Sequence, residues 1–264
     1  RRQESAALAV QSLGAVMVLG ASSLVLLGAP VSLAVPWLAA FVILTIAGER
    51  AELAVLVNER IGSRTLAAGC AVSTGVLAAT LWPGPGSALL GATVMLLSVV
   101  LVSSDIAART VRSSRLPRFS AVAMLSGYVW LGVAGAVWLV GGLPDGGAYD
   151  AVIHSVFLGF AMSMVMAHAP IILPAVIGRA LPYSTWMYMP LATLQLGLVI
   201  RVLVGDAYGF ERWHVAGGVL NVIALVAFAV IAVAAVLGGP RGPLARVVSD
   251  DRPATVGVRA GAHS

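Results

Sequence analysis

The chain has 264 residues, of which 59% are hydrophobic and only 10% are charged, against about 25% charged in an ordinary soluble domain. This composition excludes a soluble globular protein, because such a fold must present polar groups to water over much of its surface. The net charge of +5 does not indicate nucleic-acid binding. All basic residues are arginines in short clusters between long apolar runs, which is typical of a membrane surface.

The apolar runs predict an all-α polytopic bundle of about eight transmembrane helices. Each run reaches roughly the 20 residues that cross a bilayer, and within lipid only a helix satisfies its own backbone hydrogen bonds. In chain order the predicted spans are 6–28, 33–56, 65–82, 87–108, 119–142, 151–177, 185–205 and 214–238. Trp130 lies in the middle of the fifth span, so its indole N–H needs a partner inside the bundle.

The arginines predict the orientation of the chain. Fourteen of the sixteen lie on one side of an alternating eight-span arrangement, and only Arg201 and Arg212 lie on the other. Since arginine accumulates in cytoplasmic loops, we expect both termini in the cytoplasm. Residues 1–239 are expected to form the transmembrane domain. The Gly-, Pro- and charge-rich residues 240–264 are expected to form a disordered cytoplasmic tail.

Charged residues in the first five spans lie near their cytoplasmic ends. Glu49, Arg50 and Glu52 are near the end of the second span, and Asp105 and Arg109 near the end of the fourth. At a spacing of four residues, Asp105 and Arg109 are expected to pair on one helix face, and either could also meet the charges of the second span. Two interpretations stay open: an ion-pair cluster that locks helix ends, or a site for proton uptake or ligand docking.

Most of the strongly polar intramembrane residues belong to the last three spans. They are His154, His168, Gln195, Arg201, His214 and Asn221. Polar side chains at membrane depth cost about 2.5–3.5 kcal/mol even on lenient insertion scales, and they usually face the bundle interior and serve a function. We therefore expect the functional core within residues 150–225.

The spacing of the histidines suggests metal ligation. His154 and His168 are about 40° apart in azimuth and about 21 Å apart along one helix, a spacing at which one helix can ligate two stacked metal centres. His214 starts the eighth span at the depth of His154, which predicts an outer His154–His214 pair. Asn221 follows on the face of His214. Arg201 is expected to pair with Asp150 or Asp206, or to hold a haem propionate.

A longer pattern carries a family resemblance. The run from His154 to Met162, followed by His168-Ala-Pro170, Gly178-Arg179 and Leu198 to Val202, resembles the C-terminal half of NnrS-type membrane proteins. It resembles more distantly the subunit I-like proteins of haem–copper oxidases. The resemblance implies haem b, and copper as a further cofactor, with His154, His168 and His214 as ligands and Arg201 and Asn221 supporting them.

The same resemblance implies a role in nitric oxide, nitrosative-stress or respiratory metabolism in a bacterial cytoplasmic membrane. Catalysis by this chain alone is not expected, because an oxidase or nitric oxide reductase site needs more histidines than these spans offer. The alternatives are a small-solute or proton-coupled transporter that uses His168, Gln195 and Arg201, and a non-catalytic assembly subunit of a respiratory complex. The expected partners are the lipid bilayer and other respiratory or membrane subunits, without nucleic acid.

Overall fold

The computed structural model describes residues 2–55, 60–142, 144–177 and 183–238. Within these ranges the chain forms eight helices that are long and apolar enough to cross a membrane. The predicted all-α transmembrane bundle is thereby confirmed, and the chain is an integral membrane protein by the length and composition of its helices. The predicted tail, residues 240–264, lies outside the described residues, as do Gly178 and Arg179 of the NnrS-like pattern.

The elements follow the predicted spans to within a few residues. In chain order they are α1 (Arg2–Leu26), α2 (Val31–Val55), α3 (Arg60–Leu81), α4 (Pro83–Ser104), α5 (Ala107–Thr110), α6 (Arg115–Gly141), α7 (Gly146–Ile153), η1 (His154–Met162), α8 (Ser163–Ile177), η2 (Thr185–Met187), α9 (Tyr188–Leu198), η3 (Val199–Asp206) and α10 (Glu211–Gly238). The first two helices, which almost nothing polar separates, divide at Gly28, whose φ of 76° suits glycine.

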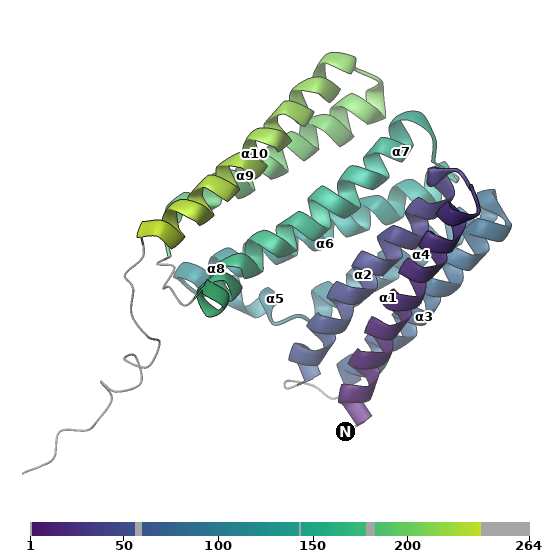
Figure 1. Cartoon of the computed structure of the whole chain (residues 1–264), viewed down its shortest axis with the longest axis horizontal. Coiled ribbons are helices and arrows are strands. Elements are labelled where there is room, and N and C mark those ends of the chain that lie inside the picture. The colour runs from purple at the N-terminus through teal and green to yellow at the C-terminus, as the bar shows by residue number, and fades with distance from the viewer. Residues whose placement is uncertain (1, 56–59, 143, 178–182, 239–264) are drawn as a thin grey trace, which may run out of the picture.

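Helices adjacent in the sequence pack against each other, because the turns between them are short. α1 packs on α2, α3 on α4, and α10 on α9 and η3, while α6 contacts both α4 and the η1–α8 helix. Figure 1 shows α1 to α4 gathered on one side of the bundle and the α9–α10 pair on the other, with α6, α7 and α8 between them. The functional core predicted for residues 150–225 therefore includes an edge of the bundle.

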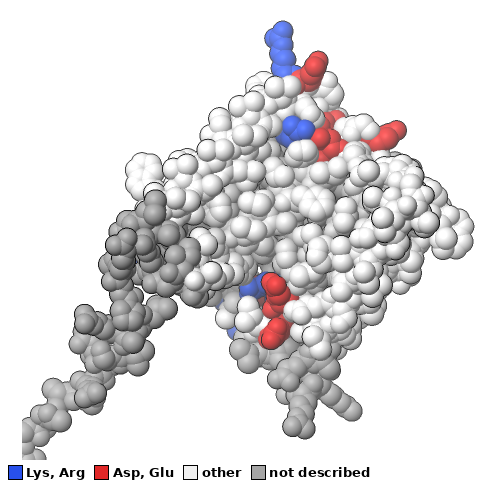
Figure 2. Space-filling view, in the orientation of Figure 1, with Lys and Arg blue, Asp and Glu red and all other residues white. Residues whose placement is uncertain are grey.

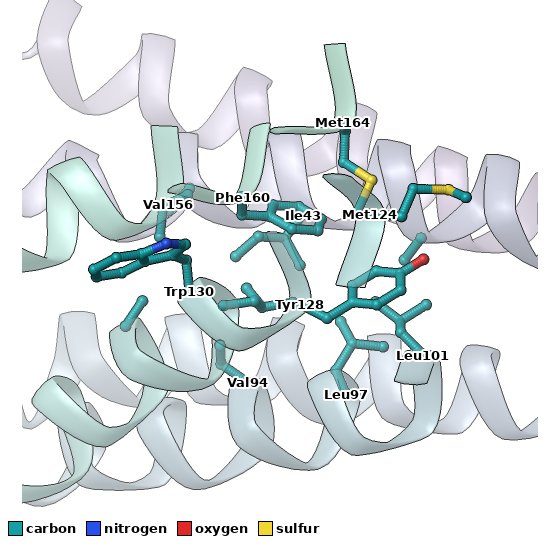
Figure 3. Close-up of a cluster of buried hydrophobic side chains, with 14 of the residues drawn as sticks. Ile43, Val94, Leu97, Leu101, Met124, Tyr128, Trp130, Val156, Phe160 and Met164 are labelled. Atoms are coloured by element: carbon teal, nitrogen blue, oxygen red, sulfur yellow. The ribbon is translucent and has the colours of Figure 1, made fainter. Parts of the chain in front are cut away.

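The central hydrophobic core lies where α4, α6 and η1 meet. Figure 3 shows Val94 and Leu97 of α4, Tyr128 of α6 and Phe160 of η1 among its residues. Tyr128 and Phe160 are fully buried, and their rings lie 6.3 Å apart. This core fixes α6 against η1, and through η1 it positions His154 and α8.

Two segments of the long helices are π-helical, which the sequence did not predict. They are His154–Met162 within the sixth span and Val199–Asp206 within the seventh. π-helical turns are rare and are found frequently at functional sites. Both segments carry residues of the predicted site, His154 in η1 and Arg201 in η3.

The fourth span ends earlier than the predicted residue 108. α4 stops at Ser104, and Asp105 follows it in an extended conformation, with φ −75° and ψ 141°. Helical i,i+4 geometry does not continue through such a residue, so the predicted pairing of Asp105 with Arg109 is wrong. Asp105 pairs instead with Arg50 of α2, one of the alternatives that the sequence left open.

Candidate functional site

Charged side chains gather at two opposite ends of the face in Figure 2, and the surface between them is uncharged. Two clusters of polar residues lie at opposite ends of the bundle. We call them outer and inner, after the side of the membrane that the arginines predict for each end. The outer cluster comprises Asp150, His154, Arg201, Asp206 and His214. The inner cluster comprises Arg50, Asp105, Tyr128 and His168.

The outer cluster is organised by an ion pair between Arg201 of η3 and Asp150 of α7. The guanidinium donates from Nε to Oδ2 at 2.8 Å and from Nη2 to Oδ1 at 2.9 Å. Such a two-point pair is stronger and more directional than a single hydrogen bond. Of the partners that the sequence left open for Arg201, the structure therefore selects Asp150.

Two of the predicted histidines meet at the same carboxylate. His154 Nδ1 lies 3.1 Å from Asp150 Oδ2 and 2.9 Å from the Asp150 carbonyl oxygen. His214 Nδ1 lies 2.7 Å from Asp206 Oδ1 and 4.0 Å from Asp150 Oδ2. The sixth and eighth spans are thus joined through the carboxylates of the outer cluster.

Glycines permit these contacts between helices. A Cβ on Gly205 would lie 2.6 Å from the His214 Cα, and one on Gly217 would lie 2.6 Å from the backbone nitrogen of Arg201. Only a residue without a side chain fits at either point, so α10 comes close enough to η3 for His214 to reach Asp206. The small residues that the sequence placed beside His214 serve this helix contact.

Asp150 and Asp206 are central to the cluster, but they were predicted only as partners of Arg201. The sequence nevertheless contained an indication that these two acids belong to the site. Both are acidic residues inside or at the end of an apolar span, and each lies within eight residues of a site histidine. Carboxylates in that setting are costly unless they meet cations or donors.

A groove opens beside the outer cluster. It has a volume of about 680 Å³ and is lined mainly by apolar residues of α10 and η1, together with His154, Arg201, His214 and Asn221. The Nδ1 atoms of both histidines contact carboxylates. Their Nε2 atoms are therefore the ring nitrogens that remain available to bind a ligand in this groove. Among the described residues, neither Nε2 atom has a hydrogen-bond partner.

Asn221 is the least satisfied residue of the groove. Its side chain is buried, with 2% of the residue exposed, and neither its Nδ2 nor its Oδ1 has a hydrogen-bond partner among the described residues. A buried polar group without a partner costs about 1–3 kcal/mol, and such a group in a native protein calls for an explanation. The amide packs against α9, where a Cβ on Gly197 would lie 2.2 Å from Asn221 Oδ1.

Arg50 lies at the centre of the inner cluster. Its guanidinium contacts Asp105 from Nε at 2.9 Å and from Nη2 at 3.2 Å, and its Nη1 lies 2.9 Å from His168 Nε2. The Tyr128 hydroxyl donates to Asp105 Oδ2 at 2.5 Å. Arg50 and Asp105 are both buried, so the cluster links α2, α4, α6 and α8 in the interior.

These contacts define the hydrogen bonding of His168. Arginine can only donate, so Nε2 of His168 accepts from Arg50, and Nδ1 carries the proton and donates to the Met164 carbonyl oxygen at 2.7 Å. Both ring nitrogens are occupied, and neither is free to bind a metal in this conformation. Of the two stacked metal centres predicted for the sixth span, the inner one at His168 therefore has no support in the structure.

The other predicted members of the inner ion-pair group lie apart from it. Glu49, Glu52 and Arg109 are exposed, and among the described residues no hydrogen bond or ion pair joins them to Arg50 or Asp105. The inner cluster therefore resembles the helix-locking arrangement more than an open docking site.

A middle layer of hydrogen bonds connects three helices between the two clusters. The Trp130 indole N–H donates to Gln195 Oε1 at 2.6 Å, and Gln195 Nε2 donates to the Ser163 hydroxyl at 2.9 Å. The internal partner predicted for Trp130 is thereby found. This layer joins α6, α8 and α9 at mid-membrane depth.

We expect Gln195→Leu to lower the free energy of unfolding by about 1–2 kcal/mol, because it leaves the Trp130 N–H without an acceptor in an apolar interior. Unfolding in mixed micelles with increasing dodecyl sulfate measures this change. Thr193→Val is the matched control, since Thr193 is exposed and bonds only to the Met189 carbonyl of its own helix. Equal stability of the two variants would contradict this role for Gln195.

The fold and these clusters define a polytopic integral membrane protein with an ionic cluster at each end of the bundle. Residues 1–237 match the family described as Domain of unknown function (DUF8744). The chain belongs to this family, whose description names no activity. Searches of curated proteins and of solved structures found no match.

Proposed function

We propose that this protein binds haem, or another flat metal cofactor soluble in the membrane, in the groove beside the outer cluster. One observation carries the proposal: four residues predicted to bind a cofactor, His154, Arg201, His214 and Asn221, line a single groove. Cofactor sites ordinarily combine a volume of about 300–1,000 Å³ and apolar walls with a few polar groups. The groove, at about 680 Å³, has this character.

The contacts of His154 suit a metal ligand. Histidines that bind metals ordinarily donate the other ring N–H to a carboxylate or a backbone carbonyl, which fixes the tautomer and the ring orientation. His154 Nδ1 contacts both the carboxylate and the carbonyl oxygen of Asp150. Its Nε2 is then the atom that would hold the iron, and Arg201 is the charged group that would face the rest of the cofactor.

The same contacts favour one axial histidine over two. In a bis-histidine haem the rings approach one iron from opposite sides, so their Nδ1 atoms point away from each other. Here the Nδ1 atoms of His154 and His214 both lie near Asp150 Oδ2, at 3.1 Å and 4.0 Å. We therefore assign the axial ligand to His154 alone and place no metal at His168.

A haem held by His154 would supply binding of small diatomic ligands and one-electron chemistry. The resemblance to NnrS-type proteins then supports a role in nitric oxide or nitrosative-stress responses or in respiratory metabolism. A bacterial cytoplasmic membrane with respiratory subunits as neighbours accords with that role. The residues of this chain would hold and orient the cofactor, and we assign none of them a catalytic step.

Titration of the purified protein with haemin tests the proposal. We expect one equivalent to bind and a Soret absorption band to form, and we expect His154→Ala to weaken binding by at least about tenfold. His168→Asn is the control, and its binding should equal that of the original chain. A chain that takes up no haemin, or a His154→Ala variant with unchanged affinity and spectrum, would refute the proposal.

A second candidate function, proton-coupled transport, has its own support. The residues expected to form its path, His168, Gln195 and Arg201, belong to the inner cluster, the middle layer and the outer cluster in turn. Flux of protons or small solutes in proteoliposomes, abolished by Gln195→Leu without loss of folded protein, would favour transport. Flux indistinguishable from that of empty liposomes would exclude it.

A further inference from the structure

The outer cluster also faces water through a second opening, distinct from the groove. This vestibule has a volume of about 410 Å³ and is lined by Asp150, Asp206, Glu211, His214 and four glycines of the surrounding turns. Oxygen or nitrogen atoms of Asp150, Asp206 and His214 lie within 4.8 Å of one another. Because four of its eight lining residues are glycines, few side chains fill the vestibule.

A second observation points to a missing ligand at this place. The side chain of Asp206 is only 3% exposed, yet its Oδ2 has no hydrogen-bond partner among the described residues. The other oxygen, Oδ1, contacts His214 at 2.7 Å. A buried carboxylate oxygen is costly when it meets neither a donor nor a cation.

The charges of the cluster do not balance. The cluster contains two carboxylates, Asp150 and Asp206. Of these two, Arg201 forms an ion pair only with Asp150. With both histidines neutral, one negative charge remains at the membrane boundary. Its compensation requires either a metal ion or an extra proton, held by a histidine or by one of the two carboxylates.

We propose that Asp150, Asp206 and His214 form a binding site for a divalent transition-metal ion that enters from the outer aqueous side. Imidazole nitrogen and carboxylate oxygen are both ligands of Zn²⁺, and three protein ligands leave its fourth position open. Imidazole is a poor ligand for Mg²⁺ and Ca²⁺, which prefer oxygen alone. Glu211 lies at the same vestibule and adds negative charge at its mouth.

The proton balance of this site follows from its contacts. One proton lies between His214 Nδ1 and Asp206 Oδ1, since a carboxylate only accepts and an imidazole nitrogen in such a contact must donate. A metal ion bound to His214 Nδ1 takes the place of that proton, which moves to Nε2, because a histidine binds a metal as the neutral imidazole. The extra proton that balances the charge of the metal-free cluster is then released, so each ion bound releases one proton to solution.

This site uses other nitrogen atoms than the proposed haem, although Asp150 contributes to both. The metal ion would use the Nδ1 side of His214 and the vestibule, whereas the haem would use His154 Nε2 and the groove. His154→Ala should therefore abolish the haem spectrum and leave Zn²⁺ binding in place. Asp206→Asn should weaken Zn²⁺ binding and leave the haem spectrum in place. Failure of one proposal is therefore distinguishable from failure of the other.

Isothermal titration of the purified chain with Zn²⁺, repeated in two buffers of different ionisation enthalpy, tests the inference. We expect one saturable site with release of one proton, no comparable site for Mg²⁺ or Ca²⁺, and weakening by at least about 10–100-fold in Asp206→Asn. His214→Gln should weaken binding similarly. Asp145→Asn is the matched control, because Asp145 is an exposed acid at the start of α7, outside the cluster.

The inference is overturned if Zn²⁺ shows no saturable binding to the original chain, since a proton then holds the site. It is equally overturned if Asp206→Asn and His214→Gln both bind Zn²⁺ as tightly as Asp145→Asn does. The midpoint of unfolding in dodecyl sulfate mixed micelles shows whether each variant has folded, so loss of Zn²⁺ binding can be distinguished from unfolding.

Discussion

Asp105→Asn is expected to lower the free energy of unfolding by about 3–5 kcal/mol. The substitution removes the counter-charge of Arg50, and both side chains are buried, with exposed fractions of 8% for Arg50 and 2% for Asp105. The Arg50 guanidinium would then keep its charge in the bundle interior without a carboxylate. The loss exceeds that of an ordinary hydrogen bond, because an unpaired buried charge is much costlier than an unpaired neutral group.

Unfolding by dodecyl sulfate in mixed micelles measures this effect, and the double variant Arg50→Met with Asp105→Asn sharpens it. Removing both charges should recover part of the lost stability, because no uncompensated ion remains. Glu52→Gln, an exposed acid of the same helix as Arg50, should change stability by no more than about 0.5 kcal/mol. A double variant less stable than Asp105→Asn alone would contradict the account.

Gly91→Ala is expected to have an effect of similar size through packing. A Cβ at Gly91 of α4 would lie 2.3 Å from the backbone nitrogen of Leu139 and 2.4 Å from the carbonyl oxygen of Gly135, both in α6. Backbone atoms of a helix cannot move singly, so α4 and α6 must separate. Close contact through small residues is what holds membrane helices together, and overpacking costs typically about 1–3 kcal/mol and occasionally more.

Gly132→Ala is the matched control on α6. The nearest atom to a Cβ there is the Ser98 hydroxyl oxygen at 3.7 Å, an ordinary van der Waals contact. We expect this variant to unfold at the same dodecyl sulfate concentration as the original chain, or slightly higher, because alanine favours the helix. If Gly91→Ala were as stable as Gly132→Ala, the close packing of α4 on α6 would be refuted.

The fold could be predicted from the sequence because a bilayer imposes one length and one secondary structure on each span. The partners of Arg201 and Trp130 could also be predicted from the sequence. A charge or an indole N–H at membrane depth must find a partner, and few candidates share its depth. The acids near Arg201, and the polar residues level with Trp130, made Asp150 and Gln195 accessible choices.

The rotational positions of side chains were harder to predict. The azimuth assigned to His154 and His168 assumed 100° per residue, but the helix is π-helical from His154 to Met162, and π-helical residues turn through a smaller angle. The break at Asp105 likewise depends on contacts with α2 and α6 rather than on local sequence. The pairing of His168 with Arg50 joins residues 118 positions apart, and no local pattern indicates it.

The most direct test of the proposed cofactor is the reduced-minus-oxidised absorption spectrum of the protein as isolated from cells supplied with haem. We expect the α and Soret bands of a b-type haem in the original chain and in His168→Asn, and their loss in His154→Ala. A preparation that is colourless and free of iron, and that stays so after incubation with haemin, would contradict the proposed function.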